Sequence, residues 1–205
     1  MIESFVRILA RVSFLLVLMF SSAWAQTAQS LRVAGTIVGV DGSTLIVKPR
    51  EGSEVRVNLT EKALVFDVVK ASPADLKPGV FVGVGALPQA DGSQRAIQVM
   101  IFAEEQRGQN EGYRPWSRLP NSTMTNATVD TTITSVNGQV MTVKYKNGEQ
   151  KIIVPPDATI LAYVASDRSA IKPGANISFG NVVQKPDGIF EARRAYVGRG
   201  GVVPQ

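Results

Sequence analysis

Residues 33–48, VAGTIVGVDGSTLIVK, recur 96 positions later as residues 129–144, VDTTITSVNGQVMTVK. The turn pair Asp41-Gly42 of the first stretch is matched by Asn137-Gly138 in the second. Turn residues that recur between apolar runs indicate a duplicated structural unit. We therefore expect two similar folding units in tandem.

Each unit has the pattern of short β-strands, because β-branched and aromatic residues alternate with polar ones between turn pairs that end in glycine. In the first unit, Ser72-Pro73-Ala74-Asp75 predicts a short helix in which Ser72 caps and Asp75 returns the hydrogen bond. The expected strands of the first unit are 32–40, 44–48, 55–59, 80–86 and 95–102, with a further short apolar run at 63–69 before the helix. Those of the second are 129–136, 140–146, 151–154, 176–183 and 190–197, with the matching run at 159–164.

The predicted fold class is all-β: two tandem small OB-like β-barrels, each with one short helix, after a cleaved signal peptide. Three strands, a helix and two closing strands are the order of a partly open OB barrel. A two-layer sandwich or an SH3-like barrel stays open, because the order of strands along the chain does not fix which edges pair. The expected divisions are 1–25 signal peptide, 26–31 short segment, 32–103 first barrel, 104–125 connector, 126–198 second barrel and 199–205 tail.

The first 25 residues resemble a secretory signal, with Arg7 and Arg11 before an apolar run and Ala23-Trp24-Ala25 at the expected cleavage site. An uncleaved anchor is the alternative, but the apolar run over 12–20 is shorter than the ~20 residues of a spanning helix. We expect a periplasmic or secreted protein with no transmembrane span after cleavage.

Composition excludes several chemistries, because the chain contains no cysteine and no histidine. Disulfides, thiolate metal sites and the commonest general base are therefore absent. Export without cysteine indicates a bacterial envelope compartment. The net charge of +5 comes from scattered lysines and arginines, which argues against nucleic acid as a partner.

Enzyme motifs are also missing. Ser169-Ala170-Ile171-Lys172 matches a Ser-x-x-Lys motif, but Pro173-Gly174 ends the segment at once. Gly83-Val84-Gly85 is not followed by the third glycine of a dinucleotide loop. We predict no catalytic residue, no cofactor and no enzymatic activity.

The connector carries the candidate binding residues Tyr113, Arg114, Trp116 and Arg118. Aromatic and arginine side chains are typical anchors of interfaces. We expect Tyr113 and Trp116 to wedge between the barrels with Arg114 stacked on a ring; an exposed binding loop is the alternative. Met124 with Trp116 is a candidate copper(I) site of thioether and indole.

The same connector carries a resemblance. Glu-Gly-x-Arg-Pro-Trp at 111–116 and Ser-x-Met-Thr-Asn-Ala-Thr-Val at 122–129, with Tyr145-Lys146, Val154-Pro155-Pro156 and Asp167-Arg168-Ser169, resemble exported bacterial proteins often labelled metal ABC transporter permease. Their first half is similar to a small exported domain of unknown function. This chain departs from the family pattern at Ser117, where an aspartate is usual. A permease needs several spanning helices, and the chain offers none after its signal.

These observations predict a non-enzymatic envelope protein that binds a partner protein or an extended ligand. The alternative is a periplasmic accessory or binding protein of a metal transport system, as the family label suggests. A third class, the binding of a polyanion or glycan across the barrel faces, would show affinity that falls steeply with salt.

Overall fold

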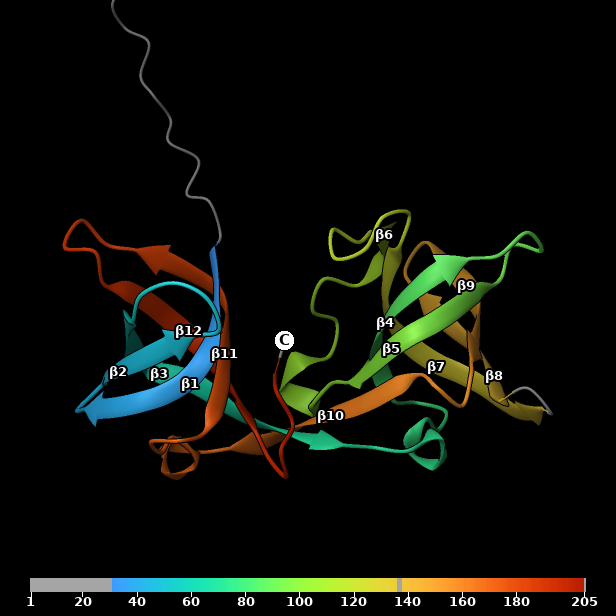
Figure 1. Ribbon diagram of the computed structural model, residues 1–205. Helices are drawn as coiled ribbons and strands as arrows, with labels where there is room; N and C mark the ends of the chain where they lie inside the picture. The colour runs from blue at the N-terminus through green and yellow to red at the C-terminus, as the bar shows by residue number, and fades with distance from the viewer. Residues whose placement is uncertain (1–30, 136–137, 205) are drawn as a thin grey trace, which may run out of the picture.

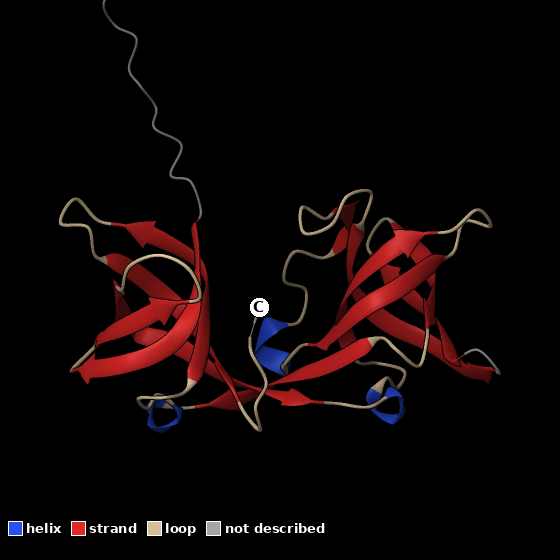
Figure 2. Cartoon of the chain, viewed as in Figure 1, coloured by secondary structure: helices blue, strands red, loops and turns tan. Residues whose placement is uncertain are grey.

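The computed structural model describes residues 31–135 and 138–204. The predicted signal peptide and its cleavage site lie outside these residues. Within them strands are the main regular structure, joined by turns, loops and three short 3-10 helices (Figure 2). The predicted all-β class is therefore confirmed.

The strands follow the expected ranges closely, with the turn glycines between them. They are β1 (Leu31–Asp41), β2 (Thr44–Pro49), β3 (Val55–Lys70), β4 (Phe81–Pro88), β5 (Gln94–Ile101), β6 (Gly112–Pro115), β7 (Thr123–Ser135), β8 (Gly138–Tyr145), β9 (Gly148–Val154), β10 (Thr159–Ser166), β11 (Asn176–Gln184) and β12 (Phe190–Gly198). The helices are η1 (Pro73–Asp75), η2 (Glu104–Gln106) and η3 (Arg168–Ala170).

Five strands form a closed barrel, which we call the first lobe. Its order is β1-β2-β3-β12-β11 and back to β1, with β3 and β12 parallel and the other neighbours antiparallel. Inward side chains from all five strands build one core that includes Ile37, Val47, Leu59, Phe179 and Ala192. The period-two alternation of these strands thus places one face inside and the other in solvent.

The second lobe is the ring β4-β5-β9-β8-β7, in which β7 pairs back with β4. The β5–β9 pairing is short and parallel, joining Gln94 to Ile152 and Arg95 to Ile153. A separate core fills this lobe and contains the fully buried Val84, Met141 and Ile152. The two lobes lie side by side (Figure 1).

Each lobe takes strands from both repeats, which corrects the expected division into one barrel over 32–103 and another over 126–198. The first three strands of the first repeat pair with β11 and β12 of the second repeat. Strands β7, β8 and β9 of the second repeat are closed by β4 and β5 of the first. The repeats have exchanged their closing hairpins.

The exchange depends on β3, which runs unbroken for 16 residues where the sequence predicted a strand over 55–59 and a separate apolar run over 63–69. Its first half pairs with β2, and its pairing with β12 of the first lobe continues to Val68 opposite Gly198. The second half also pairs antiparallel with β10, from Val65 opposite Ser166 to Lys70 opposite Leu161. Residues 65–70 correspond to 160–165 of the second repeat, since Val65 pairs with Ala195 as Ile160 pairs with Val99, so this pairing lies on a local two-fold axis.

The predicted helices are single turns that begin as the sequence indicates. Asp75 Oδ2 accepts hydrogen bonds from the Ser72 backbone N–H and hydroxyl, both at 2.8 Å. In the second repeat Asp167 Oδ1 accepts from the Ser169 N–H at 2.7 Å. These short turns end the crossing strands and redirect the chain into the closing hairpins.

The C-terminal segment returns to the junction between the lobes (Figure 1). Val202 is buried there against Val68, Met100 and Leu161, and Arg199 Nε lies 2.9 Å from Asp67 Oδ1 of β3. No helix in the described ranges has the length and apolar character needed to cross a membrane.

Candidate functional site

A cavity of about 210 Å³ lies where the two lobes meet. The first lobe contributes residues of β1, β11 and β12 to its wall, and the second lobe contributes residues of β4, β5 and β7. Tyr163 of the crossing strand β10 lines it, and so do Arg114, Trp116 and Arg118 of the connector. Segments far apart in the sequence therefore build one site.

Trp116 packs in this cavity against β4 at a place where the strand has glycines and therefore no side chains. A Cβ atom placed on Gly85 would lie 2.4 Å from Trp116 Cζ3, and one on Gly83 would lie 2.8 Å from Phe102 Cε2. Residues two apart on a strand share one face, so the two glycines together leave room for two rings. The Trp116 backbone N–H also donates to the Ser122 carbonyl at 2.8 Å, which fixes the loop.

Arg118 also approaches the indole. Its guanidinium carbon lies 5.8 Å from the ring centroid of Trp116, within the range of a cation–π contact. The expectation that Arg114 stacks on a ring is wrong, because Arg118 makes that contact and Arg114 Nη1 donates to the Asn110 carbonyl at 2.8 Å. The Trp116 ring thus packs against β4 and lies beneath an arginine of its own loop.

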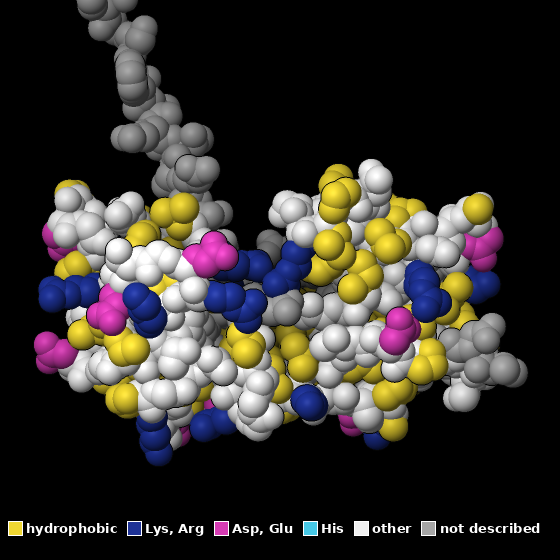
Figure 3. All heavy atoms as spheres, viewed as in Figure 1, with side chains coloured by type: hydrophobic (Ala, Val, Ile, Leu, Met, Phe, Trp, Pro, Cys, Tyr) yellow, Lys and Arg dark blue, Asp and Glu magenta, His cyan; other side chains and the backbone are white. Residues whose placement is uncertain are grey.

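Four arginines line the cavity, two from the connector and two from the first lobe: Arg32, Arg114, Arg118 and Arg194. Burial lowers the pKa of Arg114, and burial followed by the charge of Arg32 lowers the pKa of Arg118. Arginine nevertheless stays protonated at any ordinary pH. Figure 3 shows lysine and arginine side chains gathered where the lobes meet.

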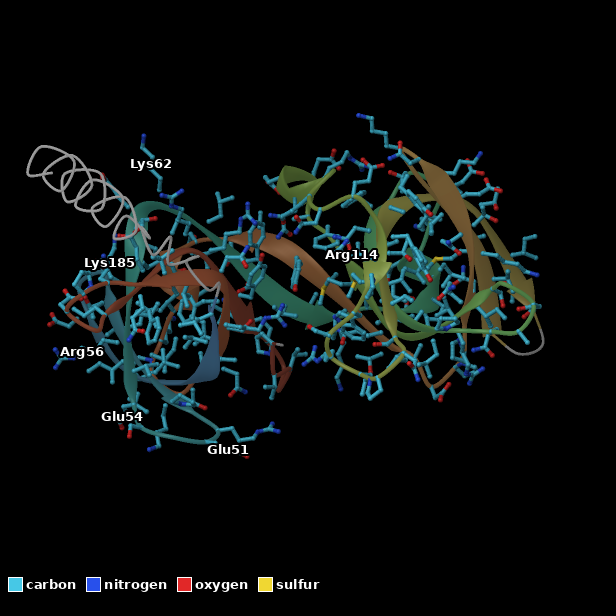
Figure 4. The ribbon with its side chains drawn as sticks, turned by 90° about the horizontal axis from the view of Figure 1, so that it is seen from above. Glu51, Glu54, Arg56, Lys62, Arg114 and Lys185 are labelled. Atoms are coloured by element: carbon cyan, nitrogen blue, oxygen red, sulfur yellow. The ribbon has the colours of Figure 1, made fainter. Side chains whose placement is uncertain are left out.

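Within residues 31–135 and 138–204, these four arginines form no ion pair, and no carboxylate lines the cavity. Glu51 and Glu54 lie at the outer edge of the first lobe, away from Arg114 (Figure 4). Like charges that converge without a counter-charge repel each other. The cavity is therefore an uncompensated positive site.

The floor of the cavity is a cluster of rings on the local two-fold axis. Tyr163 and Tyr196 have centroids 4.6 Å apart, Phe66 stacks on Tyr196 at 5.6 Å, and Phe102 meets Tyr163 edge-on at 5.7 Å. Burial, followed by the neighbouring Tyr196, raises the pKa of the Tyr163 hydroxyl. Burial also raises the pKa of Tyr196, whose hydroxyl accepts a hydrogen bond from Gln106 at 3.1 Å. The rings pack chiefly on one another.

The structure brings together most of the residues that the sequence singled out. Arg114, Trp116, Arg118 and Met124 all line the cavity, whereas Tyr113 does not and is 43% exposed. The expected connector 104–125 is more ordered than a loop, since it holds η2, β6 and the start of β7. β6 pairs with β7 on the second lobe, and this pairing presents Arg114 toward the first lobe.

Sequence reasoning missed Arg32, Arg194, Tyr163 and Tyr196, because their approach depends on the exchange of hairpins. A usable signal was present in Gly83-Val84-Gly85, which we had tested only as a nucleotide loop. Two glycines at alternate positions of a strand mark a close approach by another group. Here that group is a pair of aromatic rings.

No protein-family model, curated protein or solved structure matches this chain. In the described part of the chain, no three histidine, cysteine, aspartate or glutamate side chains cluster as metal ligands.

Proposed function

We propose that this protein is an exported, non-enzymatic binding protein of the bacterial envelope that holds a partner protein or an extended ligand between its two lobes. Each lobe is an OB-like barrel in this proposal. Its strand order, with a parallel contact between the third and last strands and a short helix before the closing pair, supports that name. The closing pair belongs to the other repeat.

The observation that carries the proposal is the convergence of four unpaired arginines and Trp116 on one cavity between the lobes. Arginine and tryptophan provide most of the binding energy at many interfaces. The four arginines are costly to place together without a partner, because their like charges repel one another. A bound partner that carries negative charge would remove this repulsion and would pack against the Trp116 ring.

The resemblance to proteins with a metal-transport label supports a second candidate, a metal-binding accessory, and Met100, Met124 and Trp116 do line one cavity. The geometry does not fit copper(I). Gly85 packs against the indole, and the guanidinium group of Arg118 lies over its ring, where the ion would have to bind. The surrounding guanidinium groups also repel a cation.

The test compares Trp116→Ala with Tyr113→Ala, because both remove one aromatic ring of the connector and only Trp116 lines the cavity. Each variant and the wild type capture partners from envelope extracts after thermal melting has shown that the variant is folded. We expect Trp116→Ala to lose the captured partner and Tyr113→Ala to keep it. Equal capture by both folded variants would contradict a site between the lobes.

A parallel titration tests the metal alternative. In the chain from residue 26 onward, Trp116 is the sole tryptophan, so its fluorescence reports on the cavity alone. Copper(I) coordinated by the indole and a thioether would quench this emission. We expect no quenching, and strong quenching at equal concentrations of metal and protein would restore the metal-binding candidate.

A further inference from the structure

The positive site extends beyond the central cavity. A neighbouring cavity of about 480 Å³ shares Arg32 and Arg118 with it and adds Lys48 and Arg50. On the other side, a cavity of about 260 Å³ shares Arg194 and adds Arg193. We call this continuous series of cavities the basic track.

The basic track has a much larger excess of basic over acidic side chains than the chain as a whole. The whole chain has 22 lysines and arginines against 17 acidic residues. In the described residues, the track is lined by seven basic side chains and one acidic side chain, Glu191. Glu191 is already paired with Lys185 at 3.2 Å. A ligand that follows this track must carry several negative charges along its length.

The central cavity also requires a hydrogen-bond donor. Asn126 is 3% exposed and lines the cavity, and its Nδ2 donates to the Gln109 carbonyl at 2.9 Å. Its Oδ1 is buried and has no donor among the described residues. Leaving such a buried acceptor unpaired is unfavourable. A ligand with N–H groups can pair it, whereas a phosphodiester backbone offers no donor.

Ring stacking is not what the site offers. Trp116 packs against Gly85 with Arg118 over its ring, and Tyr163 and Tyr196 pack on each other. Nucleobases are held in single-strand sites mainly by free aromatic faces, and sugar rings contact such faces in the same way. The site therefore recognises its ligand by charge and hydrogen bonding rather than by stacking on aromatic rings.

We propose that the basic track binds an acidic segment of a partner polypeptide in extended form, with its carboxylates on the arginines and a backbone N–H group on Asn126 Oδ1. This inference rests on the proposed function and names the chemistry of its ligand. Planar guanidinium groups bind carboxylates through paired hydrogen bonds. Arginine clusters are an established way to recognise acidic motifs.

The test uses the chain from residue 26 and a peptide of alternating glutamate and serine of about eight residues, which spans roughly 26 Å when extended. The matched probe replaces each glutamate by glutamine. Titration calorimetry and Trp116 fluorescence measure binding. We expect the acidic peptide to bind, the neutral one not to bind, and affinity to fall as salt rises.

Two double variants assign the binding to the track. Arg32→Gln with Arg118→Gln removes two charges from it, whereas Arg56→Gln with Lys62→Gln removes two exposed charges from the first repeat outside the track, at positions labelled in Figure 4. The first double variant should bind the acidic peptide at least about tenfold more weakly. The second should bind it as the wild type does. Equal weakening in both overturns the inference.

Oligothymidylate and oligogalacturonate complete the comparison. If either binds more tightly than the acidic peptide through Arg32 and Arg118, the ligand class is wrong while binding between the lobes stands. If no probe depends on these arginines, the inference fails. The capture experiment with Trp116→Ala then decides separately whether the lobes hold a ligand at all.

Discussion

At the scale of single residues, the site depends on the absence of a side chain at Gly85. Any Cβ there would overlap the Trp116 ring, with 2.4 Å to Cζ3. The ring therefore has to leave its place before any larger residue can be accommodated. The matched position is Gly180, which lines the same cavity and whose added Cβ would meet only Tyr196 Cε2 at 3.9 Å.

We expect Gly85→Ala to displace Trp116, to shift its emission and to destabilise the fold by about 1–3 kcal/mol, as overpacking does. Gly180→Ala should leave both the emission and the stability close to those of the wild type. Fluorescence spectra and urea unfolding of the two variants measure this. Identical spectra for Gly85→Ala and the wild type would contradict the packing of the indole on β4.

At the scale of elements, the C-terminal segment fastens the junction where the strands of the two repeats cross. Val202 is 7% exposed and packs with residues of β3, β5 and β10, whereas the adjacent Val203 is 48% exposed. Val202→Ala should lower the free energy of unfolding by about 1–3 kcal/mol, since it removes buried methyl groups. Val203→Ala should change it by less than about 0.5 kcal/mol. Urea unfolding of both variants tests this, and equal losses would show that the segment does not pack on the junction.

The sequence predicts where most strands and turns lie, but it does not predict which strands pair with each other. Turn pairs such as Asp41-Gly42 mark the hairpins, because glycine there adopts a positive φ of 56°. Nothing local distinguishes β3 from two strands, since residues 60–63 can form either a turn or extended chain. The two repeats also present equivalent strand edges, so β1 can pair with the closing hairpin of either repeat. The unbroken course of β3 determines which closing hairpin β1 pairs with. The same course brings Arg32 and Arg194 to the site.

At the scale of the whole molecule, the exchange of hairpins makes the two repeats inseparable. β1 of the first repeat pairs with β11 of the second, and Thr36 lies opposite Asn176. If each repeat closed its own barrel, Thr36 would instead lie near Phe81, which is the first repeat's equivalent of Asn176 because Lys77-Pro78-Gly79 aligns with Lys172-Pro173-Gly174. The chain has no native cysteine, so an engineered pair reports one contact alone.

We therefore expect Thr36→Cys with Asn176→Cys to be joined by a short thiol crosslinker, and Thr36→Cys with Phe81→Cys to remain unlinked. A protease site inserted at the exposed turn between Arg107 and Gly108 lets a denaturing gel read the result. Opposite strands place paired side chains about 5 Å apart, within reach of the crosslinker. After cleavage, the first pair should hold the two fragments together as one band. Separate fragments from that pair, with the crosslink formed instead between positions 36 and 81, would mean that each repeat closes on itself and that the basic track is not assembled as described.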